Sequence, residues 1–547
     1  MNIALVLPPD QDMIEKNYRS WGGRSSHPLG LAYVAAYVRQ ATGVPITVID
    51  GNCPLGQDGG CFVFPTVEQI TNALVGHPFS LVGFSVVTMN YRPMLEIVRA
   101  VKTAHPERLI VLGGQHATLT WEDILTNVPE VDVIVLGEGE STFAELVDRV
   151  RQGAGWHEVA GIAFRRDGIV VRTPPRPLIE DLDTLPWPAR DLLPPLSQYT
   201  HLQDPHAGED QVVGTMVGSR GCPYYCSFCS IRAFYGSQPG SLWRTRSPAN
   251  IVAEMHELVD KHGAEHISFW DDIFFSQAHR VENILREIIA HNLGVSFSLT
   301  ARADLLVRNA HLLPLLRCAG CSVVEIGVES GSQAMLDRLN KKTTVEQNLR
   351  SIQLLRQHEI RVLVDFIMFD PDSTLFDLDA NLRFYQEAGL WGYYPFRLFT
   401  RLRLQPGTPA LREMQARGNT HGSIHDPPSY EFTHPEVARL YNYLLALRER
   451  LSGMGECLTR ANALIMQLSG KGHLMNEMEQ RISARCKLLS VRLKRMPYNM
   501  FRELLDLAQC SALTQKAFEQ CAKQGEHEIA RARAKLTQWE EQVYVPN

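Results

Sequence analysis

The sequence predicts an α/β protein with an open, doubly wound parallel sheet, a second strand-and-helix domain that forms an incomplete barrel, and a helical C-terminal domain. Two observations carry this prediction. Short aliphatic runs alternate with helically spaced segments over most of the chain, and helical spacing alone follows. At 547 residues the chain also exceeds the size that one hydrophobic core supports. We therefore expect four regions, which are residues 1–145, 146–210, 211–410 and 411–547.

Five strand-length aliphatic runs lie in the first region. They are residues 3–7, 46–49, 81–87, 109–112 and 131–136. The segments between them, such as 29–40 and 94–104, have helical spacing, which predicts a Rossmann-like sheet with helices on both faces. A ligand of such a sheet binds beyond the carboxyl ends of the strands, and glycines follow two of these ends, at Gly113-Gly114 and at Gly137. Glycine there admits a large flat or phosphorylated ligand, although it is equally typical of a simple turn.

The region from 146 to 210 is rich in proline, most densely at residues 173–196, and this predicts an extended connector. The region from 211 to 410 then repeats the alternation of strand and helix. Its strand candidates are residues 212–217, 266–269, 295–299, 323–328, 362–369 and 396–404, with helices such as 248–261 and 344–358 between them. Six such units predict a partial (β/α)6 barrel, open on one side, with its active residues at the carboxyl ends of the strands.

The spacing beyond about residue 411 is helical, without strand candidates. Residues 481–496 place one stripe of mainly apolar side chains along a helix, with arginines and lysines around it. The stripe consists of Ile482, Cys486, Leu489, Leu493 and Met496. We favour a packed amphipathic helix with a solvated basic face over a surface for lipid or nucleic acid.

Charge and composition disfavour several classes of protein. The net charge of -6 and the pI of about 6.4 provide no basic field that would attract nucleic acid. No apolar stretch is long enough to span a bilayer, and the run at residues 3–7 is too short for the core of a signal peptide. We therefore expect a cytoplasmic, reducing location, in which clustered cysteines bind metal more often than they form disulfides.

Three cysteines, Cys222, Cys226 and Cys229, follow directly after the first strand candidate of the barrel. Four thiolates would complete a zinc site or saturate an iron-sulfur cubane, whereas three leave one metal position open for a substrate or cofactor. A zinc ion completed by a distant histidine is the alternative, but no paired ligand motif lies nearby. Cys318 and Cys321 also form a Cys-x2-Cys pair, which we interpret as two buried small hydrophobic residues.

The cysteine spacing, Cys-x3-Cys-x2-Cys, resembles the cluster motif of the radical S-adenosylmethionine (SAM) enzymes. The glycine-bearing strand ends of the first region resemble the cobalamin-binding domain that often precedes the barrel in that family. The resemblance extends over residues 1 to about 410. Further segments that support it are residues 244–250, 269–272, 301–304, 325–332 and 406–409.

This resemblance implies roles for single residues. Cys222, Cys226 and Cys229 would each bind one iron of a 4Fe-4S cluster, whose fourth iron would chelate SAM. Asp271 or Asp272 would lie near the SAM amine, and Arg302 would pair with the SAM carboxylate. Glu329 would flank the adenosyl group, and Phe228 would cover the cluster or pack against an aromatic ligand. Taken singly, each has an ordinary alternative as part of a salt bridge or of the core.

The same resemblance places a cobalamin pocket in the first region. Its lining would include Ser85, Thr88, Met89, Gly113, Gly114, His116, Gly137 and Glu138. The Asp-x-His-x-x-Gly motif that supplies an axial histidine in other cobalamin proteins is absent. The lower face of cobalt is therefore expected to lack a histidine ligand, with Thr88 or Met89 nearest to it.

The implied activity is that of a cobalamin-dependent radical SAM enzyme with a small-molecule or natural-product substrate. The first hypothesis is a C-methyltransferase that acts on an unactivated carbon through a 5'-deoxyadenosyl radical and methylcobalamin. The alternatives are an oxidative cyclase, ring-contraction or rearrangement enzyme without methyl transfer, and a non-catalytic cobalamin or cluster sensor. An enzyme of this kind needs a one-electron reductant such as flavodoxin or ferredoxin. Trp391, Tyr393, Tyr394 and Arg397 either contact the substrate or pack in the core.

Overall fold

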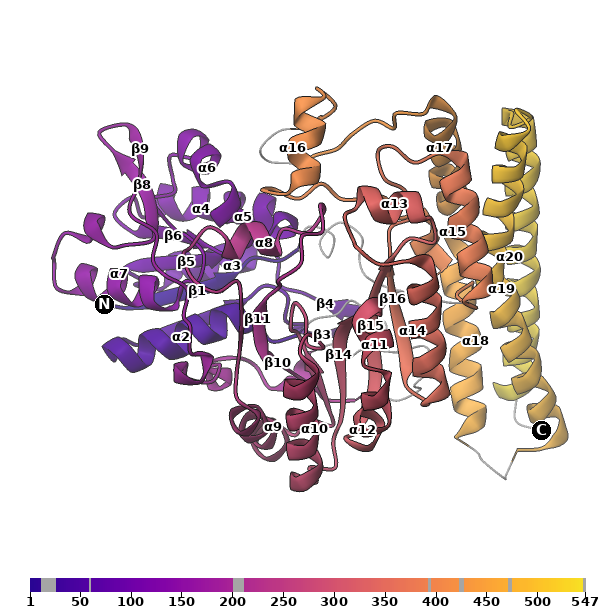
Figure 1. The fold of residues 1–547 in the computed structure, drawn as a ribbon, viewed down its shortest axis with the longest axis horizontal. Helices are drawn as coiled ribbons and strands as arrows, with labels where there is room; N and C mark the ends of the chain where they lie inside the picture. The colour runs from indigo at the N-terminus through magenta and orange to yellow at the C-terminus, as the bar shows by residue number, and fades with distance from the viewer. Residues whose placement is uncertain are drawn as a thin grey trace.

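Three parts of the chain follow one another from left to right in Figure 1: a sheet flanked by helices, a half-open barrel, and a stack of long helices. The computed structural model describes residues 1–10, 26–58, 61–199, 211–391, 395–422, 427–470 and 475–544. The predicted α/β architecture with a helical C-terminal domain is confirmed.

The first part is a seven-stranded sheet with the order β2-β1-β5-β6-β7-β8-β9. Its strands are β1 (Ile3–Leu7), β2 (Ile46–Asp50), β5 (Leu81–Ser85), β6 (Leu109–Gly113), β7 (Val133–Val135), β8 (Ile162–Arg166) and β9 (Ile169–Arg172). The first five are parallel. One core lies under α2 (Leu29–Thr42) and α7 (Glu140–Arg151), and the other under α3 (Val67–Gly76), α4 (Tyr91–Ala104), α5 (Gln115–Leu119) and α6 (Trp121–Asn127). A small hairpin of β3 (Gly56–Asp58) and β4 (Cys61–Val63) projects from the domain.

The start of the predicted connector belongs to this sheet, so the expectation of an extended segment over the whole of 146–210 is wrong. α7 ends at Arg151, and β8 and β9 add an antiparallel hairpin to β7. The hairpin turns at Asp167 and Gly168, which have φ values of 52° and 78°. Two consecutive positive φ values are typical of the two-residue turn that Asp-Gly favours. An irregular strap with three short 3-10 turns begins only after β9.

The second part contains a five-stranded parallel sheet with the order β10-β13-β14-β15-β16. Its strands are β10 (Val213–Met216), β13 (His266–Phe269), β14 (Ser296–Arg302), β15 (Cys321–Glu329) and β16 (Arg361–Phe366). The helices around it are α9 (Pro248–His262), α10 (Ala278–His291), α11 (Ala303–Arg308), α12 (Leu313–Cys318), α13 (Gln333–Arg338), α14 (Val345–Gln357) and α15 (Leu375–Glu387). A separate hairpin, β11 (Ser219–Gly221) with β12 (Trp243–Thr245), and the short helix α8 (Ile231–Tyr235) lie between β10 and α9.

The predicted sixth strand, residues 396–404, is not a strand in the described part of the chain. Pro395–Phe399 forms a 3-10 helix, η7, and a single parallel bridge joins Phe369 to Arg401. Side chains occupy the outer edge of β16 instead: Arg397 donates to the Val364 carbonyl at 2.8 Å and Thr400 to the Phe366 carbonyl at 3.1 Å. At the opposite edge, Arg190 donates to the Thr215 carbonyl of β10 at 2.7 Å. Side chains thus occupy one outward carbonyl of β10 and two of β16.

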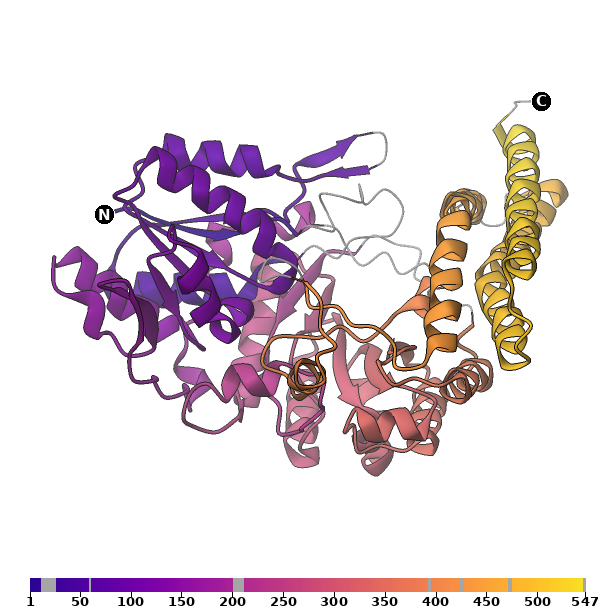
Figure 2. The same ribbon diagram turned by 90° about the horizontal axis from the view of Figure 1, so that it is seen from above.

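The third part is a stack of long helices at the C-terminal side of the molecule (Figure 2). After α16 (Pro409–Ala416), which lies apart, come α17 (Pro435–Arg450), α18 (Gly453–Ser469), α19 (Glu477–Gln509) and α20 (Gln515–Tyr544). The predicted stripe lies in α19, where Ile482, Cys486 and Leu493 are buried. α19 packs against η7 and α15, and Tyr498 donates to the Leu382 carbonyl at 3.1 Å. None of the helices in the described part of the chain is long and apolar enough to cross a membrane.

Candidate active site

The three cysteines of the motif lie on the loop that leaves the β11–β12 hairpin. Cys222 follows β11 directly, and Cys229 lies just before α8. The loop is held from two sides, because the Ser227 N–H donates to the Leu339 carbonyl and the Ser227 carbonyl accepts from the Ala410 N–H, both at 2.9 Å. All three cysteines have free, half-buried thiols. The structure therefore brings the predicted cluster ligands together on one anchored loop.

The thiols themselves lie in a partly buried environment. Burial raises the pKa of the Cys222 thiol and raises that of Cys229 to about 12, so a bare thiolate is disfavoured here and needs bound metal to offset its charge. In the described ranges, no three His, Cys, Asp or Glu side chains are grouped so as to hold a single metal ion. Each cysteine of a cubane binds a different iron, so this donor set fits a 4Fe-4S cluster.

Two cations lie beside the cysteine loop. Arg302, at the end of β14, has Nη1 3.7 Å from the Cys226 sulfur and stacks on the Tyr224 ring at 3.8 Å. Its other donors go to Asp304, at 3.0 Å, and to a backbone carbonyl. The second cation, Lys341, was not found from the sequence, because it lies after α13 in a loop that no strand pattern marks. Its buried ammonium forms a 2.8 Å ion pair with Glu329 and lies 6.0 Å from the Phe228 ring.

The two predicted aspartates at the end of β13 have different environments. Asp271 is buried and accepts hydrogen bonds from the Gly218 N–H, at 2.8 Å, and from the Ser219 hydroxyl. These bonds make Asp271 part of the support of the hairpin. Asp272 accepts from the Gly221 N–H at 2.8 Å, and its side chain is open to an internal cavity. Confinement within the protein raises the pKa of Asp272 to about 6.

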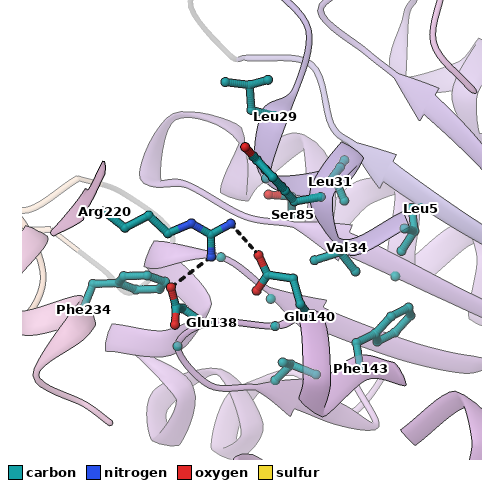
Figure 3. A pocket seen from close by; sticks show the side chains of 18 of the residues that line it. Leu5, Leu29, Leu31, Val34, Ser85, Glu138, Glu140, Phe143, Arg220 and Phe234 are labelled. Atoms are coloured by element: carbon teal, nitrogen blue, oxygen red, sulfur yellow. Dashed lines mark hydrogen bonds and ion pairs between the residues drawn. The ribbon is translucent and has the colours of Figure 1, made fainter. Parts of the chain in front are cut away.

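This cavity, of about 290 Å³, lies where the two sheets meet (Figure 3). One wall comes from the first sheet and its helices: Ser85, Gly113, Gly114, Gly137 and Glu138, which were predicted, together with apolar side chains such as Leu5, Leu31, Val34 and Phe143. The other wall comes from the barrel side: Val217, Ser219, Arg220, Phe234, Tyr235, Trp270 and Asp272. The apolar side chains and the bare glycine backbone form a surface on which a flat apolar part of a ligand can lie.

Two of the glycines have conformations that only glycine adopts easily. Gly114 has a φ of 91°, and a Cβ on it would lie 2.8 Å from the Val86 carbonyl oxygen. Gly137 has a φ of 72°, and a Cβ on it would lie 2.0 Å from Oε1 of Gln238, which reaches across from the barrel side. The predicted turn role is therefore confirmed at these positions, where the close neighbours are other protein atoms; the predicted approach to a ligand stays a prediction.

Thr88, Met89 and His116 were also predicted for the cobalamin pocket, but they do not line this cavity. They lie nearby: Thr88 Oγ1 is 3.2 Å from His116 Nδ1 and 3.5 Å from Gln405 Oε1. The Met89 sulfur accepts from Arg403 at 3.4 Å. In the described part of the molecule, Nε2 of His116 is buried without a hydrogen-bond partner, and burial lowers the His116 pKa to about 4.

Glu138 lines the cavity but is engaged in ion pairs between the two α/β domains. It accepts from Arg220 at 2.9 Å and from Arg244 at 2.7 Å. Burial opposes ionisation, but the two guanidinium groups keep the pKa of Glu138 below its usual value. Neither ion pair was predicted from the sequence, because they join residues 82 and 106 positions apart in the chain.

The second cysteine pair and the aromatic segment near residue 391 have mixed outcomes. Cys321 is buried as expected, whereas Cys318 is exposed at the end of α12, because the helix turns this residue away from the sheet. The Arg495 guanidinium lies 5.1 Å from the centre of the Trp391 ring. Arg397 donates to a backbone carbonyl at the outer edge of β16. Tyr393 and Tyr394 lie outside the described residues.

Comparisons with known proteins agree with this geometry. Residues 23–147 match the B12-binding domain, and residues 216–385 match the radical SAM superfamily. A curated relative from Pyrococcus horikoshii, described as an uncharacterized methyltransferase, is 30% identical over 408 residues, which cover 75% of this chain and 82% of the relative. The anaerobic magnesium-protoporphyrin IX monomethyl ester cyclase of Rubrivivax gelatinosus is 31% identical over 380 residues, which cover 68% of this chain and 64% of that protein.

A solved structure has the same fold. The cobalamin-dependent SAM radical enzyme OxsB, determined with aqua-cobalamin and SAM, superimposes with a TM-score of 0.75 at 16% identity, covering 100% of this chain and 81% of that one. The identity to the curated relative and the two matched domains together settle the family. The chain belongs to the cobalamin-dependent radical SAM enzymes, whose cofactors are a 4Fe-4S cluster, SAM and cobalamin.

Proposed function

We propose that the chain is a C-methyltransferase that acts on an unactivated carbon of a small molecule. The observation that carries this proposal is that both domains line one cavity. Residues of the B12-binding domain face Ser219, Arg220 and Asp272 across it. Ser219 and Arg220 directly precede the cysteine loop, and Asp272 follows β13. Cobalamin in this cavity would lie beside the SAM site. Such adjacency is what passing a methyl group requires.

We assign the site residues as follows. Cys222, Cys226 and Cys229 hold the cluster, and Phe228 with the cations Arg302 and Lys341 surrounds it. Asp272 is assigned to the SAM amine in preference to Asp271, because the carboxylate of Asp271 is already taken up by the hairpin. Arg302 keeps its proposed role at the SAM carboxylate, and Glu329, fixed by Lys341, borders the adenosyl group.

The cavity lining is assigned to cobalamin, with Thr88, Met89 and His116 at its margin. The three cofactors supply a 5'-deoxyadenosyl radical and a methyl group. The chain holds them in apposition, shields the space between them from water and presents the substrate carbon. A one-electron reductant such as flavodoxin or ferredoxin is proposed as the source of electrons.

A cyclase is the second candidate, because the relative from Rubrivivax gelatinosus carries that name at similar identity. One substrate-free experiment separates the two. Anaerobically purified protein loaded with iron and cobalamin is incubated with a reductant and SAM that carries a deuterated methyl group. A methyltransferase forms deuterated methylcobalamin, detected by mass spectrometry. The same protein with Cys226→Ala is the control for SAM cleavage.

Release of 5'-deoxyadenosine without labelled methylcobalamin contradicts methyl transfer and supports the cyclase. Purified protein that binds a cluster but no cobalamin contradicts methyl transfer as well.

A further inference from the structure

A forked ion pair joins the two α/β domains at the cavity (Figure 3). The Arg220 guanidinium donates from Nη1 to Glu138 at 2.9 Å and from Nη2 to Glu140 at 2.7 Å. All three side chains are buried, with Arg220 11% exposed. Both carboxylates belong to the B12-binding domain, whereas Arg220 belongs to the barrel side. Because the charges are buried, the removal of one partner leaves the others uncompensated.

The backbone of Arg220 belongs to the hairpin from which the cysteine loop begins. Arg220 is the central residue of β11, and Cys222 follows two positions later. Gly221, between them, has a φ of 83°, and a Cβ on it would lie 1.8 Å from the Leu242 carbonyl oxygen. The Gly221 N–H is held by Asp272. The path from the Arg220 guanidinium to the first cysteine is therefore short and tightly packed.

The same guanidinium is part of the cavity wall. It lies over the Tyr33 ring, 4.9 Å from its centre, and Figure 3 shows it beside Phe234. A ligand that fills the cavity would contact this group. Arg220 thus joins the cavity wall to the strand that leads into the cysteine loop.

We infer that Arg220 is a positioning residue that couples the cavity to the cysteine loop, so that cobalamin and the cluster each strengthen the binding of the other. This inference rests on the proposed function for the assignment of the two cofactors to these sites. Coupling between two sites is reciprocal, so the affinity for cobalamin measured with and without the cluster reports it. Couplings of this kind change affinity by about 5- to 150-fold.

Equilibrium dialysis of hydroxocobalamin tests the inference without any turnover. Cobalamin-free full-length protein is prepared anaerobically in two forms, with an oxidised reconstituted cluster and without iron. The wild type is expected to bind hydroxocobalamin at least about fivefold more tightly with the cluster. Arg220→Gln is expected to bind it equally in both forms.

Arg244→Gln is the matched control. Arg244 lies opposite Arg220 in the hairpin, donates to the same Glu138 at 2.7 Å and is 2% exposed, but it does not line the cavity. This variant is expected to keep the wild-type affinity ratio. Equal loss of the ratio in both variants means a general weakening of the domain contact and overturns the specific role of Arg220.

An affinity ratio of one in the wild type, or an unchanged ratio in Arg220→Gln, overturns the inference. If Arg220→Gln fails to fold, Glu140→Gln is measured in its place. This variant removes one of the two carboxylates that bind Arg220 and leaves Arg220 paired with Glu138. A wild-type affinity ratio in Glu140→Gln also overturns the inference. Absence of cobalamin binding in both forms contradicts the proposed function and this inference together. A ratio of one contradicts this inference alone.

Discussion

Replacement of Gly221 by alanine is predicted to disturb the cluster loop more than the fold as a whole. The φ of 83° costs an alanine about 1–2 kcal/mol. The added Cβ would lie 1.8 Å from the backbone oxygen of Leu242, a contact that no side-chain rotation relieves. β11 and β12 would have to separate by roughly 1 Å, and overpacking of this kind costs about 1–3 kcal/mol more. The expected total is about 2–5 kcal/mol, concentrated next to Cys222.

The assay compares Gly221→Ala with Gly263→Ala. Gly263 ends α9 with a φ of 67°, and a Cβ on it would have nothing within 4 Å, so its replacement carries the backbone strain without the clash. Urea unfolding of the cluster-free proteins gives the stability change, and iron and sulfide content after anaerobic reconstitution gives cluster assembly. Gly221→Ala is expected to bind less iron than either wild type or Gly263→Ala. Full iron binding with a stability loss no larger than that of Gly263→Ala refutes the reasoning.

Three further predictions concern the cysteines, a buried ion-pair network and a buried histidine. Alanine at Cys222, Cys226 or Cys229 is expected to abolish the cluster absorbance after anaerobic reconstitution. The control, Cys318→Ala, changes an exposed cysteine and is expected to leave this absorbance unchanged. An intact cluster spectrum in any of the first three variants contradicts the assignment. Glu254→Gln leaves Arg190 and Arg246 without their buried carboxylate. Urea unfolding is expected to show a free energy of unfolding lower by about 3–5 kcal/mol. The control, Asp191→Asn, removes an exposed ion pair with Arg39 and is expected to change it by about 0–1 kcal/mol. Burial lowers the His116 pKa to about 4, from 6.5 in the unfolded chain. As pH falls, the unfolded chain therefore takes up a proton before the folded one does. The wild type is expected to lose folding stability as pH falls from 6.5 towards 4. His116→Phe removes this contribution, so its thermal midpoint falls less steeply over that range; parallel pH profiles contradict the prediction.

The cluster loop could be predicted because its signal is local. The spacing of Cys222, Cys226 and Cys229 is fixed by the chain itself, and so are the glycines at the ends of β6 and β7. The two α/β domains could be predicted because buried parallel strands are short, nearly continuous apolar runs. Contacts between distant segments could not be predicted in this way. Lys341 lies in an irregular loop, and its pairing with Glu329 appears only when α13 folds back on β15.

Two misassigned segments show where local patterns are insufficient. Residues 396–404 have the strand-like spacing of apolar side chains only at their two ends. The backbone of Pro395–Phe399 forms η7, and Arg397 and Thr400 hydrogen-bond to the edge of β16 with their side chains. Residues 162–172 were assigned to the connector because of the prolines that follow them. Their Asp167-Gly168 pair is typical of a two-residue hairpin turn, and this local signal predicts the structure better than the prolines do.

The side-chain closure of the barrel sheet has a consequence for how copies of this protein behave when crowded. An outer strand with unsatisfied backbone groups is a template on which another chain can polymerise. Arg190 occupies an outward carbonyl of β10, and Arg397 and Thr400 occupy two of β16, so these carbonyls are not available to an incoming strand. An incoming strand would therefore meet side chains in place of free acceptors at these positions.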